Sequence, residues 1–158
     1  MKTLPIVWQR LVSSGETCPR CAGTGNEVER AYRQLREQLM PLGIEPVLET
    51  REIDEAAFKA KPSESNRIWI AGKPIEEWVN TSVGSSPCCS VCGDSECRTV
   101  DVGGATYEVV PEELLVKAGL IDCEVGLSGK AVALSSGNGR LPSFNVRPEL
   151  EGVLTLLR

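Results

Sequence analysis

Cysteine is the residue type whose number and spacing point to chemistry in this chain. The 158 residues include seven cysteines and no histidine. Six of the seven lie in two clusters, which are Cys18 with Cys21, and Cys88 with Cys89, Cys92 and Cys97. Thiols at such short spacing can form a disulfide or share a soft metal ion, because the thiolate is both the nucleophile and the metal ligand. The sequence therefore predicts thiolate chemistry more clearly than it predicts a substrate.

The first cluster, Cys18-Pro19-Arg20-Cys21, has the CxxC spacing of a redox pair. The Arg20 guanidinium favours the charged form of a neighbouring thiol, so we expect it to lower the pKa of both cysteines. Two other interpretations stay open: the pair supplies half of a metal site, or its thiols are inert and buried. The run from Cys18 to Gly25 also resembles CxxCxGxG, the zinc-binding repeat of the J-domain co-chaperones, although those proteins carry several copies and this chain carries one.

The second cluster has the spacing of a metal knuckle, in which two sulfurs chelate one ion. Cys89 and Cys92 are three residues apart and are followed by Gly93. Cys88 and Cys97 can supply the remaining ligands of a four-sulfur site. Adjacent side chains tend to point apart, so the vicinal pair Cys88-Cys89 leaves one thiol for redox work or for a softer ion. The cluster therefore predicts a metal or dithiol centre.

Composition and charge narrow the class of protein. With 41% hydrophobic and 25% charged residues, the chain is typical of a soluble globular domain. The net charge of −5 argues against a nucleic-acid partner, which requires a surplus of Lys and Arg. No stretch has the length and apolar character of a signal peptide or a membrane span. We expect a cytoplasmic protein without a membrane partner, in a compartment where CxxC pairs are more often catalytic or metal-binding than structural.

Hydrophobic periodicity and turn residues predict an α/β domain of the α+β type. Expected strands cover 4–12, 44–53 and 67–71, a hairpin joins 98–102 to 105–110 around Gly103 and Gly104, and expected helices cover 26–39, 54–58 and 112–118. Asn26 is expected to cap the first helix and Gly119 to end the last. The predicted order is β-α-β-α-β-β-α over residues 1–119, with an extra strand in the last hairpin, a cysteine-rich loop at 84–98 and a small appendage at 120–158.

This element order, with a CxxC between the first strand and the first helix, resembles a thioredoxin-like domain. The chain is also similar to a prokaryotic family described as a domain of unknown function. That similarity is carried by TCPRC (17–21), SNRIWIAGKP (65–74) and SPCCSVCGDSECRT (86–99). The second family implies a fold but no activity.

The thioredoxin-like resemblance implies that Cys18 attacks a disulfide and that Cys21 resolves the mixed intermediate. Two features of this sequence depart from it. The first helix is expected to begin after the cysteines, so Cys18 is expected to lack the helix dipole. Asn66 occupies the position where the resemblance implies a cis-proline facing the pair, so we expect the pair to be more open to a metal ion.

Three hypotheses follow. The first is thiol–disulfide exchange through Cys18 and Cys21 with the second cluster, and its partner is a thiol or disulfide protein or a small thiol. The second is non-catalytic binding of a thiophilic ion of zinc, copper, mercury or arsenic. The third is a structural zinc module, with Cys18, Cys21, Cys89 and Cys92 as its four ligands.

Overall fold

The computed structural model describes residues 1–88 and 92–134, with side chains described up to residue 123. The chain divides into two compact units, Met1–Gly126 and Leu127–Arg158, and all seven cysteines belong to the first. In chain order the elements are β1 (Lys2–Leu11), α1 (Pro19–Leu39), the 3-10 turn η1 (Met40–Leu42), β2 (Ile44–Ile53), α2 (Glu55–Ala60), the 3-10 turn η2 (Pro62–Glu64), β3 (Arg67–Ile70), β4 (Lys73–Pro74), α3 (Ile75–Trp78), β5 (Ser82–Pro87), β6 (Glu96–Val102), β7 (Ala105–Tyr107) and α4 (Glu112–Leu134).

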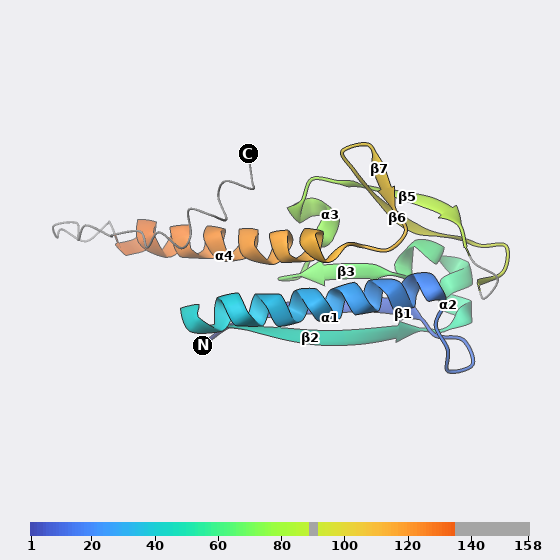
Figure 1. Ribbon diagram of the computed structural model, residues 1–158, viewed down its shortest axis with the longest axis horizontal. Coiled ribbons are helices and arrows are strands. Elements are labelled where there is room, and N and C mark those ends of the chain that lie inside the picture. Colours follow the sequence, from blue (N-terminus) through green and yellow to red (C-terminus); the bar gives the residue numbers. More distant parts are fainter. Residues whose placement is uncertain (89–91, 135–158) are drawn as a thin grey trace. The chain divides into compact units, whose positions relative to one another are not determined.

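A four-stranded sheet with the order β2-β1-β3-β4 forms the centre of the first unit. Strands β1 and β2 are parallel, whereas β3 is antiparallel to β1 and β4 is antiparallel to β3. Parallel neighbours need a crossover connection, and α1 provides it. Figure 1 shows α1 running along β1 and β2. The N-terminus of α1 therefore lies at the end of the sheet where β1 has its C-terminal residue.

The main core lies between this sheet and α1. Leu4, Ile6 and Trp8 alternate along β1 and are buried with Val28 and Leu35, which lie seven residues apart on one face of α1. The burial of each such side chain stabilises the fold by about 1.5–3 kcal/mol. This packing fixes the direction of α1 and with it the place of the first cysteine pair.

A second, three-stranded antiparallel sheet has the order β5-β6-β7. Its β5–β6 pair ends at Pro87 opposite Glu96, so the two strands form the base of the loop that holds Cys88 and Cys92. The expected cysteine-rich loop at 84–98 is thus too long, because both of its flanks pair as strands. A missed strand, β5, is the reason: its sequence SVGSSP has little of the apolar alternation by which strands are recognised.

Several predicted elements are confirmed. The strands expected at 4–12, 44–53 and 67–71 correspond to β1, β2 and β3, and Asp54 caps α2 by accepting a hydrogen bond from the backbone N–H of Ala57. The hairpin turn is also confirmed, since Gly103 and Gly104 have φ of 56° and 86°, which favour glycine. The structure therefore has the α+β class that the sequence predicts.

The predicted start of the first helix is wrong. Helix α1 begins at Pro19 rather than after Asn26, because Cys18 caps it and proline suits the first helical position. Gly25 does not break the helix. A Cβ atom at Gly25 would lie 2.5 Å from Cη2 of Trp8, so glycine is needed where the helix approaches the indole ring.

The predicted end of the last helix is also wrong, because α4 continues through Gly119 to Leu134. A Cβ atom at Gly119 would lie 2.9 Å from Cδ1 of Leu35, which indicates that glycine serves close packing of α4 on α1 rather than termination. The fourth strand of the main sheet is the short β4, which is not among the strands expected from the sequence. Most of the appendage expected at 120–158 lies outside the described residues. Within 1–88 and 92–134, every helix is too short or too polar to span a bilayer.

The start of α1 can be tested by a pair of alanine substitutions. Asn26→Ala should raise the free energy of unfolding slightly, by up to about 0.5 kcal/mol, because Asn26 is an exposed residue of the helix interior. Gly25→Ala should lower it by about 1–3 kcal/mol because the added methyl group overlaps the Trp8 ring. Urea denaturation of both variants measures this. A loss of about 1 kcal/mol in Asn26→Ala would instead indicate a helix cap at that residue.

Candidate functional site

Cys18 is the N-cap residue of α1. Its backbone is extended (φ −70°, ψ 157°), and its Sγ accepts a hydrogen bond from the backbone N–H of Cys21 at 3.4 Å. The partial positive charge of a helix N-terminus stabilises a thiolate. The expectation that Cys18 lacks this contribution is therefore wrong.

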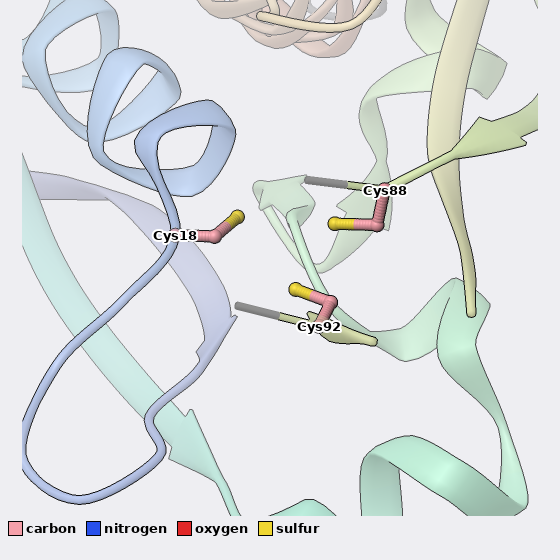
Figure 2. A group of neighbouring side chains, drawn as sticks. All are labelled: Cys18, Cys88 and Cys92. Atoms are coloured by element: carbon pink, nitrogen blue, oxygen red, sulfur yellow. The ribbon is translucent and has the colours of Figure 1, made fainter. Parts of the chain in front are cut away.

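Cys88 and Cys92 approach Cys18 from the second sheet. Cys88 directly follows β5, and its backbone N–H donates to the carbonyl of Ser95 at 3.0 Å, which draws the two sides of the loop together. The Sγ atoms of Cys18, Cys88 and Cys92 all lie within 4.8 Å of one another. Figure 2 shows the three sulfurs pointing toward one another, Cys18 from the start of α1 and the other two from the loop between β5 and β6. We call these three residues the cysteine triad.

The triad joins the two sequence clusters, since Cys18 belongs to the first and Cys88 and Cys92 to the second. Among the side chains that the structure describes, in residues 1–88 and 92–123, it is the one group of three or more metal-ligating side chains that lie together. Cys18 is buried, while Cys88 and Cys92 are partly exposed. The triad therefore has a buried corner and a side that solvent reaches.

Two further cysteines flank the triad. Cys21 is buried, and its Sγ lies 3.5 Å from Oγ of Ser65. Cys97 is buried beside Leu11, and Cys88 and Cys92 pack against this second small core. Neither sulfur belongs to the group of mutually close atoms. Cys89, the other predicted ligand, lies outside the described residues.

Burial and neighbouring thiols raise the pKa of three of these cysteines, Cys21, Cys92 and Cys97. The pKa of Cys21 is raised, first by its hydrogen bond with Cys18 and then by burial. Burial raises the pKa of Cys92, and its hydrogen bond with Cys88 raises it further. The pKa of Cys97 is raised to about 12, chiefly by burial and then by Cys88. Negative charge on one sulfur therefore disfavours charge on the others, and a bound cation would remove this repulsion.

Arg20 connects the two segments that carry the triad. It is buried on the first turn of α1, and its Nη2 donates to the carbonyl of Pro87 at 3.0 Å, next to Cys88. The same Nη2 lies 2.7 Å from a carboxylate oxygen of Glu108, which also accepts a hydrogen bond from Ser86. These contacts join the first turn of α1 to the end of β5. The predicted lowering of the Cys21 pKa is wrong, because the hydrogen bond with Cys18 and burial raise it, and for Cys18 the effect of Arg20 stays a prediction.

Asn66 lies beside α1 rather than beside the thiols. Its φ is 59°, and no cis peptide bond occurs among the described residues. Its side chain donates to Oγ1 of Thr24 at 3.0 Å and accepts from Nε1 of Trp8 at 3.3 Å. The residue before it, Ser65, is the one whose side chain reaches Cys21. The sequence analysis predicted that Asn66 faces the CxxC pair. The residue that does so is Ser65, which precedes it in the same motif.

A cavity of about 320 Å³ lies at a different place, lined in part by Glu64, Arg67, Glu76 and Arg98. Its charged side chains pair with one another: Arg67 lies 2.7 Å from Glu64, and Arg98 pairs with Glu76. No cysteine lines it. Because its charges are already compensated, the cavity is a weaker candidate than the triad for a functional site.

Comparison with known proteins places the cysteines in a family. A family model described as "Domain of unknown function (DUF2703)" matches residues 4–119, a range that includes both clusters but not Cys123. An uncharacterised protein of Archaeoglobus fulgidus is 46% identical over 112 residues, which cover 71% of this chain and 82% of that protein. No solved structure matches the chain significantly.

The role of Arg20 can be tested by cross-linking. Reduced protein treated with dibromobimane, a short reagent that joins two thiols, should give a cross-link between the peptide of Cys18 and the peptide of Cys88 and Cys92. Arg20→Gln weakens the hydrogen bond to Pro87, which is worth about 1 kcal/mol, and should reduce that yield about fivefold. Peptide mass spectrometry measures the yield.

Arg30→Gln is the matched control. Arg30 is an exposed arginine of the same helix and pairs with Glu27 and Glu112 instead. Its substitution should leave the cross-link unchanged. Equal yields in the Arg20 and Arg30 variants would show that Arg20 does not hold the triad together.

Proposed function

The chain belongs to the DUF2703 family, whose description names no activity, and we propose from the site itself that the cysteine triad binds a thiophilic metal or metalloid ion. The observation that carries this proposal is the mutual approach of three sulfurs to within 4.8 Å. The ligands are Cys18, Cys88 and Cys92. Cys97 and Cys89 are the thiols from which a fourth ligand would come.

The spacing of the sulfurs suits an ion better than a disulfide. With metal–sulfur bonds of about 2.3 Å, two sulfurs on one ion lie about 4 Å apart. A disulfide requires about 2.05 Å between its sulfurs. The triad therefore needs only a small contraction to hold an ion, whereas any disulfide within it requires a larger displacement.

The donor set restricts the ion. The chain has no histidine, and three thiolates are soft ligands that favour ions such as Cu(I), Zn(II), Hg(II) or As(III). A thiol must lose its proton to bind a metal. Burial and neighbouring thiols raise the pKa of Cys92 and Cys97, and a bound cation would offset the repulsion that opposes the loss of these protons. A reducing compartment such as the cytoplasm, which we include in the proposal, keeps the thiols available.

Loss of a triad ligand should abolish tight ion binding. We expect wild-type protein to bind about one equivalent of Cd(II), a spectroscopic substitute for other soft ions, and Cys18→Ser or Cys92→Ser to bind it at least about 100-fold more weakly, since even second-shell changes cost 10–100-fold. Competition with a chelator of known affinity measures this.

Cys123→Ala is the matched control, because Cys123 is a buried cysteine of the main core outside the triad. It should bind Cd(II) like the wild type. The proposal fails if the wild type binds no Cd(II), or if Cys123→Ala weakens binding as much as Cys18→Ser does.

Thiol–disulfide exchange is a second candidate function, favoured by the position of Cys18 at the N-terminus of α1. Two further observations support a thioredoxin-like domain as its scaffold. The elements from β1 to α3 follow the order β-α-β-α-β-β-α, and β1 to β4 lie in one sheet. In this proposal Cys18 and Cys21 form the redox pair, and the protein acts as a thiol–disulfide oxidoreductase.

Turnover of a disulfide substrate tests this candidate. Wild-type protein should accelerate the reduction of insulin by dithiothreitol, and Cys21→Ser should lose this activity because the mixed disulfide can no longer be resolved. Cys123→Ala should retain it. Full activity in Cys21→Ser would exclude the CxxC pair as the redox centre.

A further inference from the structure

Cys18 belongs both to the cysteine triad and to the CxxC pair. Its sulfur is one corner of the cysteine triad, and it also accepts the backbone N–H of Cys21 within the CxxC pair. A sulfur in a disulfide has no lone negative charge with which to bind a metal ion as a thiolate. Any bond between Cys18 and Cys21 therefore removes one of the three ion ligands.

We propose that reaction with a disulfide discharges the ion from the triad by forming a Cys18–Cys21 disulfide, so that the protein delivers its ion in response to a disulfide-bearing protein or small molecule. This inference rests on the proposed ion binding. It adds an activity, redox-driven ion release, and it assigns Cys21 a role that ion binding alone leaves open. It also explains why a CxxC pair and a three-sulfur group share one residue.

The burial of the four thiols sets the order of the steps. Cys18 and Cys21 are each 2% exposed, whereas Cys88 and Cys92 are partly exposed. An external disulfide therefore reaches the outer pair first, and Cys88 lies close enough to Cys18 to pass the oxidation inward. This order differs from the expectation that Cys18 attacks the partner directly.

The steps balance as follows. The Cys88 thiolate attacks the disulfide RSSR, forming a Cys88–SR bond and releasing the first RS⁻. The Cys18 thiolate attacks Sγ of Cys88, forming a Cys18–Cys88 bond and releasing the second RS⁻. Cys21 gives its proton to a released RS⁻ and attacks Sγ of Cys18, which forms the Cys18–Cys21 disulfide and frees the Cys88 thiolate. Two electrons pass from the protein to RSSR, and the ion leaves with its oxidation state unchanged.

Ser65 gives Cys21 a partner in the last step. Its Oγ lies 3.5 Å from Sγ of Cys21 and accepts a hydrogen bond from the backbone N–H of Leu11 at 3.1 Å. The hydroxyl proton is therefore directed away from Leu11 and is available to the Cys21 sulfur. The strand β1, through Leu11, thus holds the hydroxyl at the thiol that completes the exchange.

The experiment uses full-length reduced protein loaded with one equivalent of Cd(II) and treated with one equivalent of hydroxyethyl disulfide. Cd(II) release is followed with a chelating dye, and the disulfides are mapped by peptide mass spectrometry. We expect one Cd(II) released for each Cys18–Cys21 disulfide formed, with Cys88 and Cys92 recovered as thiols. The oxidised protein should bind Cd(II) at least about 100-fold more weakly than the reduced protein, and reduction with a phosphine should restore the affinity.

Cys21→Ser separates this inference from the proposed function, with Cys21→Ala as a second variant and circular dichroism as the fold control. Both variants keep the triad and should bind Cd(II) like the wild type. Their reaction with the disulfide should stop at a bond between Cys18 and Cys88.

The outcomes are distinct. A wild type that binds no Cd(II) overturns both proposals. A wild type that binds Cd(II) but keeps it after forming the Cys18–Cys21 disulfide, or releases it with a Cys88–Cys92 disulfide as the product, overturns the discharge alone. Failure of the Cys21 variants to accumulate the Cys18–Cys88 bond overturns the proposed order of steps.

Discussion

The first turn of α1 is the feature on which the site depends. A helix N-terminus leaves backbone N–H groups without helical partners, and here the Cys18 sulfur accepts one of them. The cap fixes Cys18 in an extended conformation at the end of the main sheet where β1 has its C-terminal residue. The same interaction that begins the helix thus orients a sulfur and stabilises its thiolate. The Cys18 sulfur thus both pairs with a backbone N–H group at the start of the helix and forms part of the site.

The site also depends on the three-stranded sheet, which carries the loop with Cys88 and Cys92 to Cys18. The approach is held by Arg20, which follows Cys18 by two residues and bonds the carbonyl that precedes Cys88. Burying a charged guanidinium costs free energy unless the group is paired. The Arg20 side chain therefore favours the arrangement in which the Pro87 carbonyl and the Glu108 carboxylate both stay in contact with it. Glu108 and Ser86 extend the same network into the segment after β7 and into β5. The triad is therefore a product of packing between the two sheets rather than of either loop alone.

The two proposed activities, ion binding and disulfide chemistry, draw on a common sulfur, that of Cys18. The outer thiols, Cys88 and Cys92, are partly exposed, and the inner thiols, Cys18 and Cys21, are buried. A gradient of access across four sulfurs allows an external reagent to act at one end and an ion ligand to be lost at the other. Because each thiolate raises the pKa of its neighbours, a cation and a disulfide are two ways to relieve the same repulsion.

The sequence by itself determined the type of chemistry and most of the central sheet. Seven cysteines without histidine identify thiolate chemistry, and the local patterns around β1, β2, β3 and Gly103-Gly104 identify those elements, because they depend on neighbours in sequence. The helix start was missed because the space for Gly25 is made by Trp8, which lies on another strand. Only the tertiary structure decided that Cys18 meets Cys88 and Cys92, and that Ser65 rather than Asn66 reaches the CxxC pair. Residues about seventy positions apart come together through sheet packing and a buried arginine, and no local spacing in the sequence encodes that distance.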